Sequence, residues 1–322
     1  MKELSKGSAV WHEVGEEAAG QRVDNYLTRL LKGVPKSHVY RILRSGEVRV
    51  NSRRVGPDYR VQSGDRVRLP PLRTARPAAV PRTSVPPRLK ADVLYEDDLL
   101  LAIDKPAGVA VHGGSGVSRG VIELLRLERP QERFLELAHR LDRGTSGVLL
   151  LAKRRSALLS LHRQLREGTV QKFYDVLVKG RWREPLRSVK LPLHKYVLES
   201  GERRVSVRHE GTPAHTVFRL QRAWKGFSLL EAELKTGRTH QIRVHLAHLG
   251  YPVAGDDKYG DFALNKALAR QGLDHMFLHA RKTVIAHPRT GARLTLEAQL
   301  PSALRSYLAV LDEGDAGVAG SA

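Results

Sequence analysis

The sequence predicts an α+β protein with two domains and a mixed, mainly antiparallel β-sheet in the larger one. Three observations support this prediction. The chain has 322 residues, more than one average domain holds. A proline-rich segment, residues 70–90, separates a basic N-terminal part from the rest. Beyond it, segments with the pattern of β-strands outnumber those with the pattern of helices and often follow one another directly.

Residues 20–70 predict a small domain of two helices and a hairpin-like sheet. Apolar residues at helical spacing from Val23 to Leu31 predict the first helix. The second helix is expected to begin with Ser37 as its N-cap and to end at Gly46. Two short alternating runs predict paired strands. Basic residues cluster around the second helix and the first strand: Lys36, Arg41, Arg44, Arg49, Arg53 and Arg54.

A semi-extended basic linker is predicted for residues 71–90, because residues 70–90 contain six prolines and show no apolar periodicity. Residues 91–308 are expected to form the larger domain without a further linker. The small and acidic segment 309–322 is predicted to be a disordered tail.

Strands and helices alternate in the larger domain. One helix is predicted from Ser156 to Leu165, ended by Gly168, and another opens at the dense segment that follows residue 235. Four apolar or alternating runs predict strands, at residues 99–103, 148–152, 173–178 and 227–234.

The charge of the chain favours a polyanionic partner. The formal net charge is +21, and residues 1–90 hold 19 Lys and Arg against 8 Asp and Glu. The absence of cysteine excludes disulfides, thiol nucleophiles and Cys-ligated metal sites. The sequence shows no signal peptide and no apolar run long enough to span a bilayer, so we expect a cytoplasmic protein that does not enter the membrane.

The first dense motif is HRLDRGTSG, residues 139–147, directly before a predicted buried strand. Asp142 lies between two arginines, whose guanidinium groups favour its ionised form. An ionised carboxylate in a cleft can act as a nucleophile or as a base. The alternative is a structural ion pair that supports a turn.

The second dense motif is TGRTHQIRVHL, residues 236–246. It opens a helix, with Thr236 or Thr239 as the expected cap. Arg243 is the natural charge partner of a distant carboxylate such as Asp142, and the alternative is a surface contact to phosphate. His240 and His245 are five residues apart, and no acid lies among the histidines of this segment, so no metal site is expected.

The glycine-rich segment 112–120 resembles a dinucleotide-binding loop only in part. Its third glycine comes one residue late for the G-x-G-x-x-G pattern, and no acid is placed for a ribose. Neither this segment nor any other predicts a cofactor.

Taken together and in order, the two dense motifs resemble those of the RluA-type pseudouridine synthases. Lys105-Pro106-Ala107-Gly108, Lys172-Phe173-Tyr174 and Gly255-Asp256 with Tyr259-Gly260 match further elements of that family. Three stretches beginning at residues 155, 198 and 255 most resemble its RluC subtype, which modifies several uridines of 23S ribosomal RNA. Residues 20–70 resemble an S4-type RNA-binding domain.

The resemblance implies a chemistry for three residues. Asp142 would be the essential carboxylate, acting at C1′ or as a base at C2′ of the target uridine. Arg243 would pair with Asp142, and Tyr174 would stack on the base and assist proton removal at C5. Uridine isomerisation breaks the N1–C1′ bond and joins C5 to C1′, so it needs no redox group or other cofactor.

RNA contacts are expected from both domains. Arg140 would fill the gap that the flipped nucleotide leaves. The remaining contacts are expected from His139, Arg143, Arg238 and His240 in the larger domain, and from Lys36, Arg41, Arg44, Arg53 and Arg54 in the smaller one. The expected partner is 23S ribosomal RNA or a precursor of the large ribosomal subunit, bound by a monomer.

Two alternatives stay open on the sequence. The catalytic motifs do not exclude a synthase that acts on transfer RNA. A non-catalytic RNA-binding protein of ribosome assembly would also explain the charge and the S4-like domain, although binding alone does not require a carboxylate between arginines.

Overall fold

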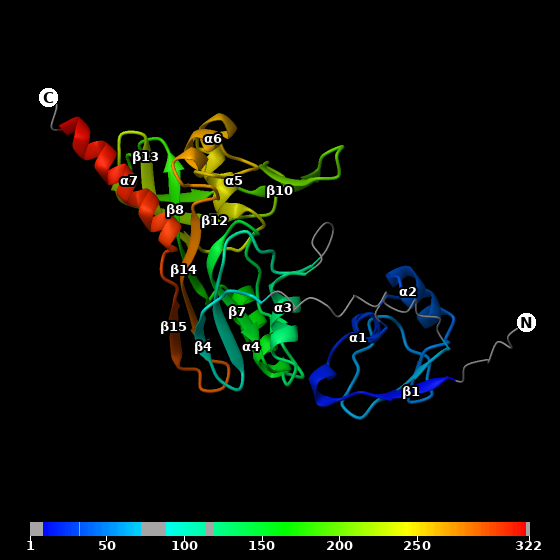
Figure 1. Ribbon diagram of the computed structural model, residues 1–322. Helices are drawn as coiled ribbons and strands as arrows, with labels where there is room; N and C mark the ends of the chain where they lie inside the picture. The colour runs from blue at the N-terminus through cyan, green and yellow to red at the C-terminus, as the bar shows by residue number, and fades with distance from the viewer. Residues whose placement is uncertain (1–8, 32, 72–87, 114–118, 320–322) are drawn as a thin grey trace, which may run out of the picture. The chain divides into compact units, whose positions relative to one another are not determined.

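The computed structural model describes residues 9–31, 33–71, 88–113 and 119–319 and divides into two compact units, Met1–Pro87 and Arg88–Ala322 (Figure 1). Most of the predicted linker and residues 114–118 of the glycine-rich segment lie outside the described residues. Each unit has its own apolar core. The described part therefore consists of two units, and each is treated by itself below.

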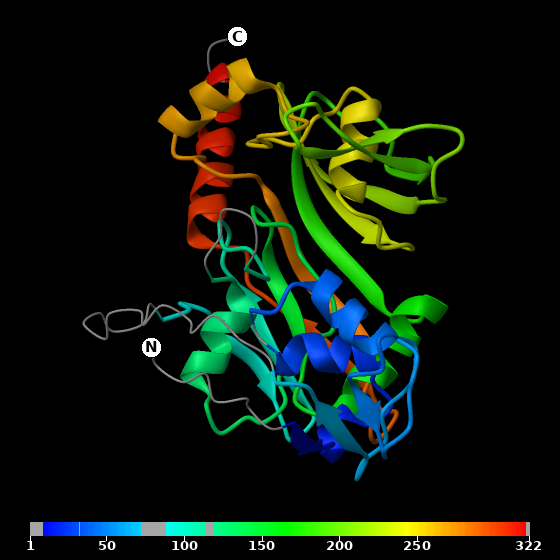
Figure 2. The same ribbon diagram turned by 90° about the vertical axis from the view of Figure 1, so that its right-hand side faces the viewer.

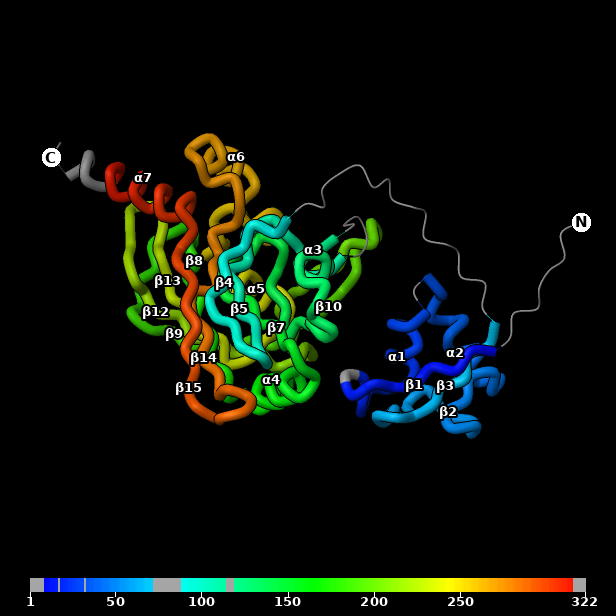
Figure 3. The backbone as a smooth tube through the Cα atoms, turned by 60° about the horizontal axis from the view of Figure 1, so that its bottom comes forward, coloured from blue at the N-terminus to red at the C-terminus, as the bar shows by residue number. Residues whose placement is uncertain are grey.

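In the N-terminal unit, two helices pack on a small antiparallel sheet. Helix α1 (Val23–Leu30) and helix α2 (Lys36–Arg44) accompany the strands β1 (Val10–Glu13), β2 (Arg49–Val50) and β3 (Arg66–Leu69), in the order β1-β3-β2 (Figure 3). A short 3-10 helix, η1 (Glu16–Ala18), follows β1. Both predicted helices and the pairing of β2 with β3 are confirmed.

Two details of this unit differ from the prediction. Pro35, not Ser37, occupies the N-cap of α2, and Ser37 lies inside the first turn. Strand β1 was not expected, yet it pairs with β3 from Val10↔Leu69 to Glu13↔Arg66. Its apolar residues are too few and too exposed for a local pattern to show a strand, and only the edge of β3 completes it.

The larger unit is built on a mixed ten-stranded sheet, which confirms the predicted fold class. The main path runs β4-β5-β7-β14-β8-β13-β12-β9, with β6 paired to β7 and β15 paired to β14. Of the pairs between its named strands in the described residues, β7 with β14 is parallel and the others are antiparallel. The strands are β4 (Val93–Glu96), β5 (Leu100–Lys105), β6 (Glu136–Leu137), β7 (Ser146–Ala152), β8 (Gln171–Lys179), β9 (Leu186–Lys190), β12 (His215–Ala223), β13 (Phe227–Leu234), β14 (Leu278–Ala286) and β15 (Arg293–Glu297).

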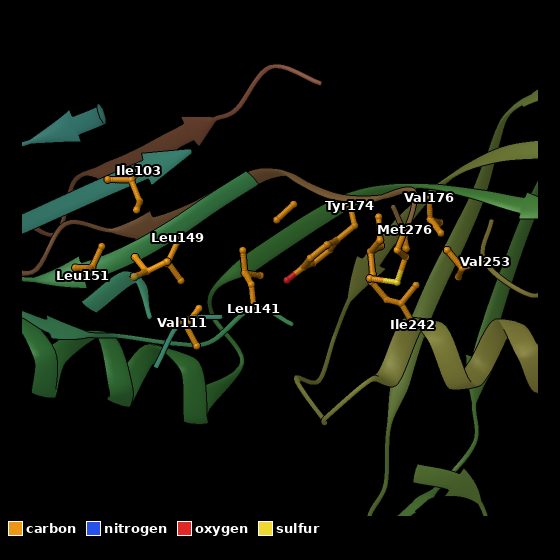
Figure 4. Packing of buried hydrophobic residues seen from close by; sticks show 14 of the residues in the cluster. Ile103, Val111, Leu141, Leu149, Leu151, Tyr174, Val176, Ile242, Val253 and Met276 are labelled. Carbon is orange, nitrogen blue, oxygen red and sulfur yellow. The ribbon is translucent and has the colours of Figure 1, made fainter. Parts of the chain in front are cut away.

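Helices cover both faces of this sheet. Side chains of a strand alternate between faces, so Leu101 and Ile103 of β5 pack in one cluster with α3 (Val121–Glu128) and α5 (Gln241–His248). Leu100 and Ala102 pack in another with α4 (Arg155–Glu167). Figure 4 shows part of the first cluster, with the hydroxyl of Tyr174 directed toward Leu141. Leu141 of the first dense motif belongs to this cluster, so the core supports the loop that carries the motif.

The start of β7 is set by a close approach to β14. Gly147 has φ +106°, and a Cβ atom there would lie 2.3 Å from the carbonyl oxygen of Ala280. Only glycine fits this parallel register, in which Gly147 lies opposite Ala280. The contact fixes where the loop of Asp142 enters the sheet.

A separate two-stranded hairpin, β10 (Leu193–Val197) with β11 (Arg203–Val207), lies outside the main sheet. Helices α6 (Phe262–Arg270) and α7 (Ser302–Ala319) share an apolar cluster through Leu268, Leu304 and Tyr307, and Figure 2 shows the red α7 beside the orange α6.

The predicted disordered tail from residue 309 is wrong for the residues that the structure describes, because α7 continues to Ala319. The side chain of Asp312 accepts hydrogen bonds from Arg222 at 2.9 Å and from the indole of Trp224 at 2.8 Å. These partners lie about ninety residues away in the sequence, so composition alone suggested a tail.

Candidate active site

A cleft with a volume of about 610 Å³ opens in the larger unit where the two dense motifs meet. Strand β8 contributes Lys172 and Tyr174 to its wall. Among the described lining residues Asp142 is the one acid, against six Lys and Arg: Arg140, Arg166, Lys172, Lys235, Arg238 and Arg243. Such a cleft attracts a polyanion and presents it with a single carboxylate.

The loop that carries Asp142 is held by a buried lysine. Lys105 is fully buried, and its Nζ donates to the carbonyls of Pro106 and Val109, at 2.8 Å each, and of Arg143, at 3.3 Å. Burial lowers the pKa of Lys105 to about 8, although the charges of Asp142 and Asp104 oppose the shift. This lysine therefore fixes the backbone next to Asp142.

Arg243 joins the carboxylates of Asp142 and Asp256 from inside the protein and also pairs with the exposed Asp257 at 3.4 Å. Its Nε and Nη2 donate to the two oxygens of Asp256 at 2.7 and 2.6 Å, and its Nη1 donates to Oδ2 of Asp142 at 3.1 Å. Burial disfavours its charge, but the bonds to Asp256 and the charge of Asp142 outweigh this and raise the pKa of Arg243. The planar guanidinium fork is suited to this geometry.

Asp256 is fully buried and accepts hydrogen bonds from the backbone N–H groups of Lys258 and Tyr259, at 2.8 and 3.1 Å. Burial alone would raise its pKa, yet the bonds from Arg243 and from the backbone lower it. A permanently charged Asp256 thus anchors Arg243 where it reaches Asp142.

His240 faces the other oxygen of Asp142. Its Nε2 lies 3.9 Å from Oδ1 of Asp142, and its Nδ1 lies 2.8 Å from the hydroxyl of Tyr259. Burial is the main reason that the pKa of His240 is lowered, and the charge of Asp142 opposes the shift. The imidazole is therefore neutral near pH 7.

His240 itself, with φ +54°, occupies the N-cap position of α5. The sequence had placed the cap at Thr236 or Thr239. That prediction is wrong, because the helix begins after His240, no side chain of the described residues caps it, and the Thr236 hydroxyl donates to the side chain of Gln241.

Tyr174 and Lys172 line the cleft beside Asp142. Burial and then the charge of Asp142 raise the pKa of Tyr174 far above its usual range, so the phenol stays neutral. Burial lowers the pKa of Lys172. Its Nζ lies 3.2 Å from the place where a Cβ atom of residue 237 would be, so Gly237 leaves room for it.

The other predicted contacts of the larger unit fall into two groups. Arg140 and Arg238 are exposed and line the cleft. His139 also lines it, but its Nε2 accepts the backbone N–H of Leu150, and burial lowers its pKa to about 4, so it carries no charge near neutral pH. Arg143 is absent from the lining and donates to the carbonyl of Gly108 at 2.9 Å.

In the N-terminal unit, the five predicted contact residues are all exposed. Arg53 and Arg54 line a concavity of about 670 Å³ together with Val50, Asn51 and Tyr59. Lys36, Arg41 and Arg44 lie on α2. The unit thus presents exposed cations on the helix and on the turn that follows β2.

Two site residues had no role assigned from the sequence, namely Asp256 and Tyr259. Both belong to the Gly255–Gly260 element, which resembles a family motif. Such residues can be found in a sequence as charged or phenolic side chains that lie between two glycines shortly after a helix. Their hydrogen-bond and ion-pair partners, however, follow only from the fold.

Within the described residues, no group of three His, Asp or Glu side chains is arranged to hold a metal ion. Nor does any described helix combine the length and apolar character that crossing a membrane requires.

Comparison with known proteins decides the family. The RNA pseudouridylate synthase model matches residues 99–248, and the S4 domain model matches residues 21–67. "Ribosomal large subunit pseudouridine synthase C" of Pasteurella multocida is 50% identical over 303 residues, which are 93% of each chain. Its namesake in Escherichia coli K12 is 51% identical over 297 residues, 91% of this chain and 93% of the relative.

The chain belongs to the RNA pseudouridylate synthase family. It is therefore an isomerase, and the family resemblance found from the motifs is confirmed. Among solved structures, human RNA pseudouridylate synthase domain containing 4 aligns with a TM-score of 0.55 and 26% identity, over 68% of this chain and 92% of that one. The human domain containing 1 shares the fold, with a TM-score of 0.54.

Proposed function

We propose that this pseudouridine synthase modifies uridines of the large-subunit ribosomal RNA, 23S RNA, with Asp142 as its catalytic residue. The relatives that support this target carry it in their names and cover more than nine tenths of the chain. The observation that carries the proposal is the Asp142–Arg243 pair, 3.1 Å long, in a cleft whose other charged lining residues are cationic.

A single carboxylate suits an isomerase better than a hydrolase. A hydrolytic glycosidase places two carboxyl groups on opposite sides of the bond that it breaks. In isomerisation the uracil leaves C1′, stays bound and returns through C5. Asp142 then acts at C1′ as a nucleophile or at C2′ as a base, and Arg243 orients its carboxylate in both cases.

Tyr174 is proposed to stack on the target base. The raised pKa of Tyr174 disfavours the phenolate. We therefore assign this residue the role of a neutral ring that stacks on the base, and not that of a base at C5. The position of Tyr174 beside Asp142 in the cleft supports this role.

Arg140, exposed at the cleft, is proposed to occupy the gap left by the flipped nucleotide. Base flipping costs a few kcal/mol. Phosphate contacts from the exposed cations of both units, including Arg238 and the five predicted contacts of the N-terminal unit, offset this cost.

The test replaces Asp142 by asparagine. Release of tritium from uridine labelled at C5 in a large-subunit RNA transcript measures product, and filter binding measures affinity. We expect Asp142→Asn to bind RNA within about twofold of the wild type and to form no product, because the amide keeps the volume and lacks the charge. Asp98→Asn, at a carboxylate that is 67% exposed and outside the cleft lining, is the matched control and keeps its activity. Appreciable product from Asp142→Asn contradicts the proposal.

Mapping pseudouridines in total RNA with and without the gene identifies the target. Loss of sites in transfer RNA alone would favour the transfer-RNA alternative, and binding to ribosomal RNA without any product would favour a non-catalytic assembly protein. We also propose that the enzyme acts in the cytoplasm as a monomer, and light scattering of the purified protein tests the oligomeric state.

A further inference from the structure

His240 has a backbone conformation that is unusual for a side-chain-bearing residue. Its φ of +54° lies in the left-handed region, where residues other than glycine are strained. The imidazole of this residue is hydrogen-bonded to the hydroxyl of Tyr259 at 2.8 Å and faces the carboxylate of Asp142 at 3.9 Å. Such a conformation indicates that the position of the imidazole ring is functionally important.

The hydroxyl of Tyr259 has a defined direction. It accepts the backbone N–H of Val205 from hairpin strand β11 at 2.9 Å. Its own proton is then available to the one further partner within hydrogen-bond distance among the described residues, Nδ1 of His240. A neutral imidazole carries a single proton, so Nδ1 accepts and the proton is on Nε2.

The opposite side of the ring agrees with this assignment. Nε2 faces Oδ1 of Asp142, and an N–H dipole directed at a carboxylate is favourable, whereas a lone pair there would be repelled. The charged groups around the ring are Asp142, Asp256, Arg243 and Lys258. Of these, Asp142 is the group that the Nε2–H faces.

Tyr259 also contacts the second partner of Asp142. The guanidinium carbon of Arg243 lies 5.2 Å from the centre of its ring, in a cation–π arrangement. Arg243 binds Oδ2, and His240 faces Oδ1. One tyrosine therefore supports both groups that orient the carboxylate.

We propose that Tyr259 is a positioning residue, which holds His240 in its Nε2–H tautomer so that this N–H orients Oδ1 of Asp142. This inference rests on the proposed role of Asp142. A neutral N–H orients the carboxylate without the full ion pair that an imidazolium would form, so Oδ1 stays reactive.

The experiment compares Tyr259→Phe with the wild type. Phenylalanine keeps the ring beneath Arg243 and removes only the hydroxyl. We expect kcat to fall about tenfold, the factor that corresponds to one neutral hydrogen bond, with KM unchanged within about twofold. Tyr251→Phe, outside the cleft lining, is the matched control and keeps kcat within about twofold.

A second measurement reads the tautomer directly. Long-range ¹H–¹⁵N correlation spectra of histidine-labelled protein distinguish the two neutral tautomers and the imidazolium, and the spectrum of His240→Gln identifies the signal of His240. We expect the Nε2–H form in the wild type and a shift toward the Nδ1–H form in Tyr259→Phe.

Several results would overturn the inference. One is an Nδ1–H or imidazolium form in the wild type, which is informative even if Tyr259→Phe fails to fold. The others are a fall in kcat without a tautomer change, a tautomer change without a fall in kcat, and an effect on KM alone. Absence of product from the wild type would instead refute the proposed function, because the tautomer is measured without turnover.

Discussion

Replacement of Arg243 by methionine is expected to destabilise the larger unit strongly. The guanidinium is 5% exposed and Asp256 is fully buried, with bonds of 2.7 and 2.6 Å between them. Methionine leaves the Asp256 carboxylate, among the residues that the structure describes, with the backbone N–H groups of Lys258 and Tyr259 as its hydrogen-bond donors. Removing one partner of a buried ion pair costs about 3–5 kcal/mol, because an uncompensated charge stays in the interior.

The double variant separates this penalty from lost packing. Asp256→Asn keeps the volume of the side chain and an oxygen for the two backbone donors, but carries no charge. Added to Arg243→Met, it should therefore recover about 2 kcal/mol or more of the free energy of unfolding. Neither the single nor the double variant has a guanidinium to pair with Asp142, so both lose product formation whatever their stability.

The assay is urea-induced unfolding followed by fluorescence. Trp182 and Trp224 are 2% and 4% exposed in the larger unit, so they report its unfolding. Arg289→Met is the matched control, because Arg289 and its ion-pair partner Asp98 are 60% and 67% exposed, and such a surface pair contributes little to stability. A loss below about 1 kcal/mol in Arg243→Met, or strict additivity in the double variant, would refute the reasoning.

Three further outcomes are expected. Gly147→Ala should lower the free energy of unfolding by about 2 kcal/mol or more. Gly250→Ala should lower it clearly less, because a Cβ atom at residue 250 would meet no other atom within 4 Å. Equal losses would contradict the close approach of β7 to β14. Burial opposes ionisation of Asp97, but backbone N–H bonds lower its pKa from 3.8 to about 2, so the stability it contributes is complete above about pH 4 and is lost as the pH falls toward 2. Asp97→Asn should remove about 2 kcal/mol of that acid-sensitive stability, and a titration of unfolding free energy unchanged by the substitution would be inconsistent with it. Removal of residues 1–72 should weaken RNA binding and flatten its salt dependence, since fewer phosphates are neutralised; the same slope in both proteins would mean that the S4 domain contacts something else.

Several elements could be predicted from local sequence because local physics decides them. Helix α4 ends at Gly168, whose φ of +72° few other residues adopt readily. The apolar run before Ala152 forms a strand buried on both faces. The two dense motifs identified Asp142 and suggested Arg243 as its partner. Their opposite charges are complementary however many residues lie between them in the chain.

Only the tertiary structure decided which groups share that arginine. Its Nε and Nη2 donate to Asp256, Nη2 also reaches the exposed Asp257, and its Nη1 donates to Asp142, although 101 residues separate Arg243 from Asp142. The same kind of long-range contact fixed His240 as the start of α5 and joined Asp312 to Trp224 in a helix. Local patterns describe the preferences of a segment, whereas these choices depend on hydrogen bonds and charges that distant segments supply only after the chain has folded.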